Sequence, residues 1–374
     1  MQIKIHKDNL VKSLSLVSSI VPAHPSLFVL TNMLIEADRK GTLCLSATDL
    51  DISMRIEQEA LVENDGNAII PARKMFDVVR ELPQDMILIS KNGDTLVMEC
   101  GRGHFELQTF PGEDYPALPR VDFEAALKLE GEMLLRAIDK TIFAMSKDQA
   151  RPILTGVLLE MASDYMGLVA TDGHRLARFR KKGKFKEAGK GRDMIIPMKA
   201  LNQIKKLYAS SEKVEIAVVE RQIGFRGEGK ELYTRLLEGP FPNYELVIPQ
   251  DNDKKAFINV KDMISASRRM QMLANPTTKR VTFDFSKGQL VLKVSTRDVG
   301  QANESLDIEY ANEDIEVSFN AAYIEEALKA INSERVLMLM KKEDTACIVK
   351  PEEIHDDEEN FSILMPLRIM EGEE

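Results

Sequence analysis

The sequence predicts an α+β protein built from three tandem repeats, each with antiparallel strands and two amphipathic helices. One segment recurs at steps of about 125 residues: IIPARKMFDVVREL (69–82), IIPMKALNQIKKLY (195–208) and SFNAAYIEEALKAI (318–331). In these copies, apolar residues recur at the i, i+3, i+4 and i+7 spacing of one helical face. A short β-branched or aromatic stretch precedes each copy, so the repeated element is a strand followed by a helix.

A second strand-then-helix step is expected near the start of every repeat. It covers IKIHKDNLVKSL (3–14), LKLEGEMLLRAI (127–138) and, more weakly, FINVKDMISASR (257–268). Together the two steps predict six helical segments, at 7–20, 72–82, 131–146, 198–208, 261–274 and 321–331.

The remaining strands are expected to be antiparallel, with one face buried. Segments 85–100 and 280–295 alternate apolar and polar residues, and Asn92-Gly93-Asp94 marks a hairpin turn in the first. Two helices covering one sheet face leave the sheet edges free to pair with a neighbour. We therefore expect an arc with sheets outside and helices inside, and two arcs that join head to tail in a dimeric ring.

Proline-rich, non-periodic stretches mark the exits from the first two repeats. These are FPGEDYPALP (110–119) and FPNYELVIP (241–249), and the second is followed by the charged stretch PQDNDKK (249–255). The expected domains are therefore 1–121, 122–250 and 251–374.

Composition narrows the class of protein. The chain has 374 residues, of which 44% are hydrophobic, as in ordinary folded proteins. No stretch reads as a signal peptide or is apolar for long enough to span a membrane. The three cysteines (Cys44, Cys100 and Cys347) lie far apart without a CxxC pair, which argues against a disulfide framework or a thiolate zinc site. A cytoplasmic protein without a metal or cofactor is expected.

Charge is distributed unevenly between the predicted elements. The six helical segments carry a net charge of +6, which leaves −16 for the rest of a chain whose total is −10. A positive lumen would attract phosphates, while an acidic exterior would repel a duplex. The alternative is that Lys and Arg occur there as good helix formers, and charge alone leaves both open.

Four motifs in a fixed order point to a known family. They are ATDGHRLA (170–177), IIPMKAL (195–201), FPNYELVIP (241–249) and MPLRI (365–369). With the threefold repeat and the total length, they resemble the bacterial DNA polymerase III β subunit family, the replicative sliding clamps. The resemblance implies three DNA-clamp domains in a homodimeric ring that encircles duplex DNA without reading its sequence. It implies a processivity factor rather than an enzyme, with the polymerase α subunit, the clamp loader and other proteins carrying a clamp-binding motif as partners.

The same resemblance implies a pocket for a short partner peptide between repeats two and three. Apolar walls with a polar rim suit leucine and aromatic anchors. The pocket residues carried over are Leu154, Thr171, Gly173, His174, Arg175, Leu176, Pro242, Val247, Ile363, Met365, Pro366, Leu367 and Arg368. The alternative for Leu154, Leu176 and Ile363 is ordinary core packing. His174 lacks the partners of a catalytic base or a metal ligand, and Asp172-Gly173 reads as a turn.

Two further sets of residues are expected at the DNA and at the subunit interface. The DNA-facing candidates combine positions matched to the family with helix cations inferred from charge: Lys12, His24, Arg73, Lys74, Arg80, Gln149, Lys199, Lys205, Lys206, Arg268, Asn320 and Tyr323. The interface candidates are Phe105 and Leu107 on one side, and Met272, Leu273, Gln301 and Glu304 on the other. An apolar centre with a polar rim suits a stable joint that can open.

Several positions depart from the family pattern. His24 and Leu246 stand where relatives carry basic residues, which weakens a DNA contact at neutral pH and alters the pocket rim. The acidic extension 370–374 is expected to be a frayed terminus, and the acidic run 353–360 a solvated loop.

Two other functions compete with the processivity ring. An enzyme acting on DNA would need clustered carboxylates for metal ions, and no such cluster recurs between the repeats. A repeat-built adaptor scaffold would bind peptides without encircling DNA. Retention on circular against linear DNA separates these hypotheses.

Overall fold

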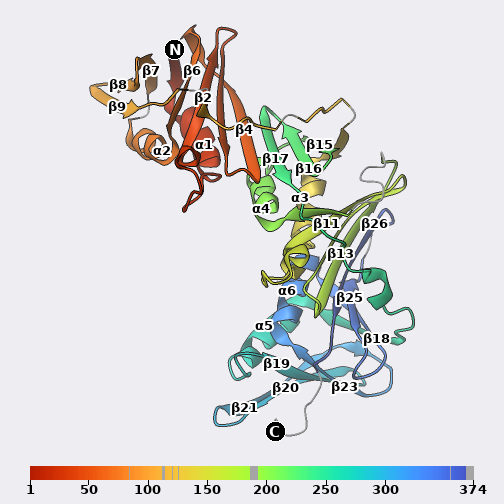
Figure 1. The fold of residues 1–374 in the computed structure, drawn as a ribbon. Helices are drawn as coiled ribbons and strands as arrows, with labels where there is room; N and C mark the ends of the chain where they lie inside the picture. Colours follow the sequence, from red (N-terminus) through yellow and green to blue (C-terminus); the bar gives the residue numbers. More distant parts are fainter. Residues whose placement is uncertain are drawn as a thin grey trace. The chain divides into compact units, whose positions relative to one another are not determined.

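The structure is a computed structural model that describes residues 1–83, 85–111, 114–119, 121–124, 126–185, 193–353 and 355–367. Contacts divide the chain into two compact units (Figure 1). Unit 1 comprises Met1–Leu135 and Lys199–Leu236, and unit 2 comprises Arg136–Met198 and Leu237–Glu374. Each unit thus combines one terminal repeat with part of the middle repeat.

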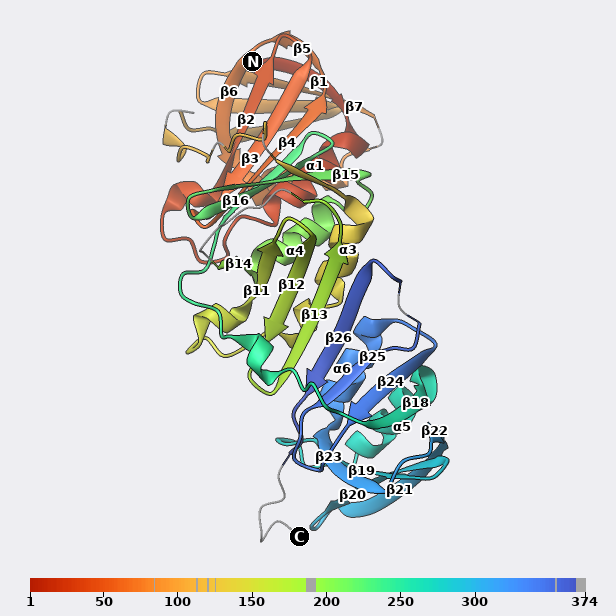
Figure 2. The same cartoon turned by 90° about the vertical axis from the view of Figure 1, so that its right-hand side faces the viewer.

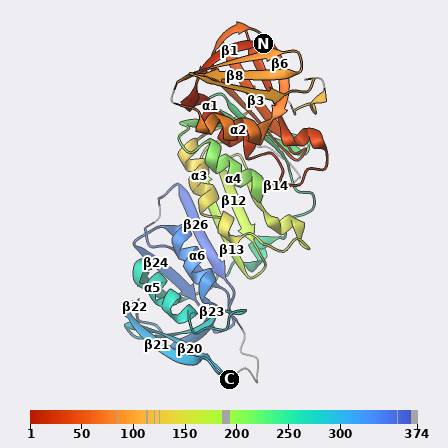
Figure 3. The same cartoon turned by 90° about the vertical axis from the view of Figure 1, so that its left-hand side faces the viewer.

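Unit 1 contains thirteen strands in two antiparallel sheets, with orders β5-β1-β7-β8-β9 and β10-β15-β16-β17-β4-β3-β2-β6. The strands are β1 Gln2–His6, β2 Asn32–Asp38, β3 Thr42–Thr48, β4 Ile52–Glu59, β5 Leu61–Asn64, β6 Gly66–Pro71, β7 Met86–Asn92, β8 Thr95–Cys100, β9 Gly103–Gln108, β10 Leu127–Glu130, β15 Lys213–Val219, β16 Gln222–Gly227 and β17 Lys230–Arg235. Helices α1 (Lys7–Ser18) and α2 (Ala72–Glu81) pack against each other, with strands of unit 1 behind them in Figure 3. A short 3₁₀ helix, η1, covers Phe28–Thr31.

Unit 2 has the same architecture, with sheet orders β14-β11-β12-β13-β26-β25-β24-β18-β22 and β21-β20-β19-β23. Its strands are β11 Gly156–Met161, β12 Tyr165–Thr171, β13 Arg175–Lys182, β14 Met194–Pro197, β18 Lys254–Asn259, β19 Arg280–Ser286, β20 Gln289–Thr296, β21 Gly300–Asp307, β22 Glu309–Tyr310, β23 Ile315–Asn320, β24 Arg335–Met340, β25 Cys347–Pro351 and β26 Glu358–Leu364. Its helical segments are η3 (Ile142–Ala144), η4 (Pro152–Thr155), η5 (Tyr244–Val247), α5 (Val260–Gln271) and α6 (Ala321–Ile331), and α5 packs against α6. Helices α3 (Gly131–Asp139) and α4 (Met198–Leu207) belong to the middle repeat.

The large sheets join strands from neighbouring repeats. In unit 1, β17 pairs with β4, so that Arg55 lies opposite Glu231. In unit 2, β13 pairs with β26, so that Leu176 lies opposite Ile363, and Figure 2 shows these two strands side by side. The expectation that sheet edges join neighbouring repeats is therefore confirmed within each unit.

The α+β class and the two helices per repeat are confirmed. All six predicted helices are present, and in each case a strand leads directly into the helix: β1–α1, β6–α2, β10–α3, β14–α4, β18–α5 and β23–α6. Alternation in β19 (RVTFDFS) buries Val281, Phe283 and Phe285 in the core of the third repeat, as period-2 patterning requires. The predicted hairpin joins β7 to β8 through a turn in which Gly93 has φ +59°.

Two local expectations differ from the structure. The helix predicted at 131–146 ends at Asp139, and Thr141 Oγ1 then donates to the carbonyl of Ala137 at 2.8 Å before η3 begins. The prediction of a solvated loop at 353–360 is wrong for the second half of this range, because strand β26 begins at Glu358. There Glu358 pairs with Arg136 and Lys181, so strand pairing and opposite charge outweigh the acidic composition. Within the described ranges, no helix is long and apolar enough to cross a membrane.

Candidate functional site

The loop of the ATDGHR motif is a turn held by its own side chains. Asp172 Oδ1 accepts the backbone N–H groups of His174 (2.8 Å) and Arg175 (3.0 Å). Thr171 Oγ1 accepts the Gly173 N–H at 3.1 Å and donates to the Arg175 carbonyl at 2.7 Å. Gly173 has φ +92°, so the predicted turn with a glycine at positive φ is confirmed.

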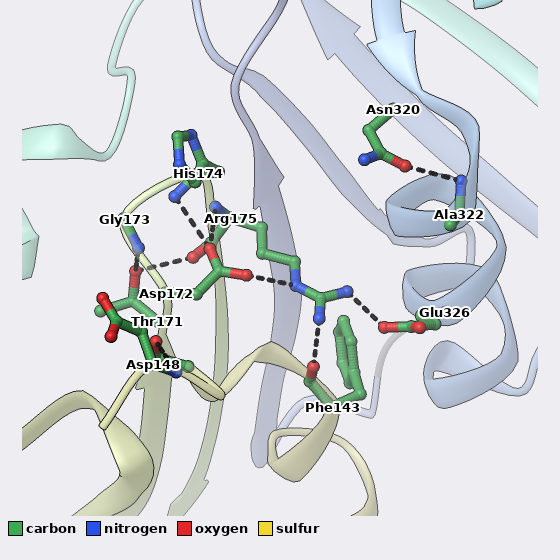
Figure 4. Close-up of polar contacts among 11 residues, drawn as sticks. Phe143, Asp148, Thr171, Asp172, Gly173, His174, Arg175, Asn320, Ala322 and Glu326 are labelled. Carbon is green, nitrogen blue, oxygen red and sulfur yellow. Dashed lines mark hydrogen bonds and ion pairs between the residues drawn. The ribbon is translucent and has the colours of Figure 1, made fainter. Parts of the chain in front are cut away.

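Arg175 ties this turn to the rest of unit 2, as Figure 4 shows. Its side chain is only 5% exposed. The guanidinium donates to Asp172 (3.0 Å), Glu326 (2.5 Å) and the Phe143 carbonyl (2.6 Å). It also lies 4.2 Å from the ring centre of Tyr323, within cation–π range. Strand β13, segment η3 and helix α6 therefore meet at one buried charge.

The apolar residues predicted for the peptide pocket gather beside this turn. Leu154, Leu176 and Ile363 are buried in one cluster that also contains Phe241 and Tyr244. The cluster draws on η4, β13, β26 and η5, which lie far apart in the sequence. Burial of these three side chains agrees with the core-packing alternative as well as with a pocket floor.

Other predicted pocket residues lie at the surface. Val247 is 51% exposed and Met365 is 41% exposed, and Pro242 is also exposed. Met365 donates its N–H to the His174 carbonyl at 3.0 Å, and Leu367 donates to the Ser318 carbonyl at 2.8 Å. The chain through Pro366 thus runs beside the turn, while Arg368 lies outside the described residues.

His174 and Arg175 also line a cavity of about 350 Å³. Asn320 and Tyr323, which were expected to face DNA, share this cavity with those two residues. Asn320 Oδ1 also accepts the Ala322 N–H at 3.0 Å and so caps helix α6. Gln149 is exposed on the loop next to Asp148, another lining residue.

Most of the predicted DNA-facing cations are exposed, and several already have partners. Arg73 donates to the Val21 carbonyl at 3.0 Å, Arg268 pairs with Glu325 at 2.7 Å, and Lys199 pairs with Asp49. Arg80 pairs with Glu81 at 3.1 Å. Exposed ammonium groups without a partner in the described chain are those of Lys12, Lys74 and Lys206. His24 is exposed, and Lys205 is half-buried with a partner.

The predicted interface residues lie on or beside two edge strands. Strand β9 is the last strand of its sheet and carries Phe105, which is 36% exposed, and half-buried Leu107. Strand β21 is the edge of its own sheet and carries exposed Gln301 and half-buried Glu304. Glu304 pairs with Arg269 at 2.8 Å.

Beside β21, at the end of α5, Met272 is 78% exposed, and Leu273 is half-buried. Both predicted interface surfaces therefore combine an unpaired strand edge with exposed apolar side chains.

A polar network on the nine-stranded sheet was not predicted from the sequence. Arg180 donates to Glu160 (3.0 Å) and to the Tyr244 hydroxyl (2.7 Å), which in turn donates to Glu160 at 2.6 Å. Burial raises the pKa of Tyr244, as does the Glu160 carboxylate. The signal was available in the sequence, because Arg178 and Arg180 stand on either side of Phe179 in β13 and so share one face of the strand.

No group of three or more His, Cys, Asp or Glu residues in the described part of the chain could hold a metal ion. Other features of the structure are typical of a binding protein. It has repeated clamp-like units with exposed strand edges, and a turn bordered by an apolar cluster and a cavity.

Comparison with known proteins identifies the family. Sequence models of the DNA polymerase III beta subunit match in chain order: the N-terminal domain at residues 1–119, the central domain at 128–243 and the C-terminal domain at 245–368. The chain is 32% identical over 312 residues to the beta sliding clamp of Streptomyces coelicolor, covering 82% of each protein. It is 31% identical over 314 residues to that of Synechococcus elongatus, covering 82% of this chain and 84% of the other.

Solved structures agree. A sliding clamp from Bartonella birtlesii superposes with a TM-score of 0.92 at 30% identity, covering 99% of this chain and 100% of the other. The DNA polymerase III subunit beta of Pseudomonas aeruginosa also superposes with a TM-score of 0.92, at 27% identity, covering 99% of this chain and 100% of the other. The chain belongs to the DNA polymerase III beta subunit family, the beta sliding clamps, which are non-catalytic processivity factors.

Proposed function

We propose that this chain forms a head-to-tail homodimeric ring around duplex DNA and tethers the replicative polymerase to it. Pairing β9 of one subunit with β21 of the other would satisfy two sheet edges at each joint and bury Phe105, Leu107, Met272 and Leu273. The observation that carries the proposal is the presence of both unpaired, partly apolar edges in a chain of the clamp family.

DNA would be held loosely in the ring. Phosphate contacts carry no sequence information, so a few exposed cations suffice for a protein that must slide. Lys12, Lys74 and Lys206 are the best candidates because their ammonium groups have no partner in the described chain. Arg73, Lys199 and Arg268 would first have to exchange a protein partner for a phosphate.

Partners would dock at the ATDGHR turn. We assign the polymerase α subunit, the clamp loader and other clamp-binding proteins to a surface formed by His174, Val247, Pro242 and Met365 above the buried Leu154–Leu176–Ile363 cluster. Exposed apolar side chains over a preformed floor suit a short peptide with apolar anchors. We also assign Asn320 and Tyr323 to this site, because they share the cavity beside His174.

The proposed compartment is the cytoplasm, where the chromosome lies. All three cysteines are buried free thiols, which suits a reducing environment.

The experiment is a retention assay on DNA of two topologies. The protein is loaded by its clamp loader onto nicked circular plasmid, and half of the sample is then linearised. A ring stays on the circle in high salt and is lost from the linear form. Equal loss from both forms, with peptide binding intact, would favour the adaptor scaffold and refute the ring.

A further inference from the structure

Two proline-rich segments cross the sheets at the two junctions between repeats. In unit 2, the segment at 241–249 crosses the large sheet near the β13–β26 pair and contributes Phe241 and Tyr244 to the apolar cluster described above. In unit 1, residues 115–119 of the first proline-rich segment lie beside the β17–β4 pair. There the Tyr115 hydroxyl accepts the Thr48 N–H at 3.2 Å and donates to the Asn32 carbonyl at 3.3 Å.

A cavity of about 910 Å³ lies between this first segment and the sheet of unit 1. We call it the first-junction groove and define it by Glu36, Arg55, Glu57, Tyr115, Glu231 and Tyr233. The strand registers place these sheet residues on one face, because Arg55 lies opposite Glu231 and Ser53 opposite Tyr233. Pro116 and Leu118 add apolar surface from the crossing segment.

The groove has more carboxylates than cations. Arg55 is the cation among the lining residues that the structure describes, and it pairs with Glu57 at 3.0 Å and reaches Glu36 at 4.0 Å. Glu231 accepts the Tyr233 hydroxyl at 2.6 Å, and its cross-strand neighbours Arg55 and Arg226 pair with Glu57 and Glu215 instead. Glu36 is 41% exposed and Glu57 is 47% exposed, so both remain accessible to a ligand.

This chemistry differs from that of the second junction. The cluster near β13 and β26 is apolar, and the arginines of that face are paired with Glu160 and Glu359. At the first junction, Glu36, Glu57 and Glu231 outnumber Arg55 among the described lining residues, so the groove attracts a cation and repels phosphate. The wall of proline, leucine and tyrosine can cover the aliphatic stem of a lysine or arginine.

We propose that the first-junction groove is a second docking site, which takes a basic peptide segment of a partner protein. A lysine or arginine of that segment binds Glu231 and Glu36, and its apolar neighbours lie against Pro116 and Leu118. The site does not depend on ring closure or on the ATDGHR turn, so it can fail while the proposed function stands.

The test uses the full-length protein and a fluorescein-labelled nonapeptide. The peptide carries two lysines flanking a Val-Pro pair and lacks leucine and aromatic residues, so it cannot supply the anchors expected at the ATDGHR turn. Its binding is measured by fluorescence anisotropy. Carbodiimide coupling of its lysines to protein carboxylates is then mapped by mass spectrometry.

The groove variant is Glu36→Gln with Glu231→Gln, which changes charge without changing shape. The matched control is Glu343→Gln with Asp344→Asn, an equal charge change at exposed residues outside the groove. Unchanged thermal unfolding of both variants checks that they fold.

We expect the groove variant to weaken binding about tenfold and the control about twofold or less. Coupling should concentrate on Glu36, Glu57 and Glu231, and a peptide with glutamates in place of the lysines should not bind. An equal loss in both variants would show general charge attraction and overturn the proposal. Loss of binding in Leu176→Ala alone would also overturn the proposal, because the peptide would then occupy the pocket at the ATDGHR turn. Self-association of the chain that the groove variant abolishes would overturn it as well, because the occupant of the groove would then be a second copy of the chain.

Discussion

Replacement of Arg175 by alanine tests the geometry around the ATDGHR turn. The side chain is 5% exposed and holds together Asp172, Glu326 and the Phe143 carbonyl. Its removal leaves the Phe143 carbonyl without this donor and removes the cation stacked 4.2 Å from the centre of Tyr323.

The size of the effect follows from burial. Breaking a buried ion pair by removing one partner costs about 3–5 kcal/mol. Asp172 Oδ1 keeps its two backbone donors, and the Glu326 side chain is 42% exposed and can turn to water. We therefore expect about 3 kcal/mol, the lower end of that range. Arg175→Lys keeps the charge but loses the forked donors, so we expect an intermediate loss.

The assay is native-state hydrogen exchange of amides in β13 and α6, because a chain with several domains does not unfold in one step. The control is Arg151→Ala, which removes a pair with Asp148 in which both side chains are 49% exposed. That variant should lose about 0.5 kcal/mol. A loss of about 1 kcal/mol or less for Arg175→Ala, similar to the control, would refute the view that this charge holds the junction.

Three further predictions concern neighbouring positions. Burial opposes ionisation of Glu325, but Lys329, Arg268 and Gln271 outweigh it and lower its pKa to about 2. The ionised Glu325 side chain should stabilise the fold fully above the ordinary pKa of a glutamate, and this stabilisation should be lost as pH falls towards 2. When the free energy of unfolding is measured against pH, it should therefore fall less in acid for Glu325→Gln than for the wild type. Gly173→Ala forces alanine to φ +92° and should lower the free energy of unfolding, measured with denaturant, by about 1–2 kcal/mol. The same variant should also bind a peptide with leucine and aromatic anchors more weakly, as measured by fluorescence anisotropy. Asn320→Ala removes a helix cap and should lower stability by about 1 kcal/mol, whereas Asn320→Asp should be nearly neutral in the same assay.

The repeat architecture could be predicted because its signals are local. Helical spacing in 198–208 and alternation in 280–286 each arise within one element, and both are present in the structure as α4 and β19. The Asp172-Gly173 turn was also predictable, since the side-chain bonds that hold it lie within five residues. These features depend little on the rest of the chain.

The long-range features could not be predicted in this way. The contacts of Arg175 with Phe143 and Glu326 depend on how three segments meet, and nothing in the ATDGHR motif itself encodes them. The Arg178–Glu359 pair depends on the register of β13 against β26. The helix cap at Asn320 is different, because an asparagine before a helical run is a cap signal that can be recognised in the sequence.

The central claim, closure of two chains into a ring, is tested most directly by disulfide trapping of the joint. Leu107→Cys on β9 is combined with Leu273→Cys beside β21, and the two single variants are controls. Head-to-tail closure predicts that mild oxidation of the double variant gives a covalent species that stops at the dimer. A ladder of trimers and larger species, or a double variant that stays monomeric, would contradict the ring.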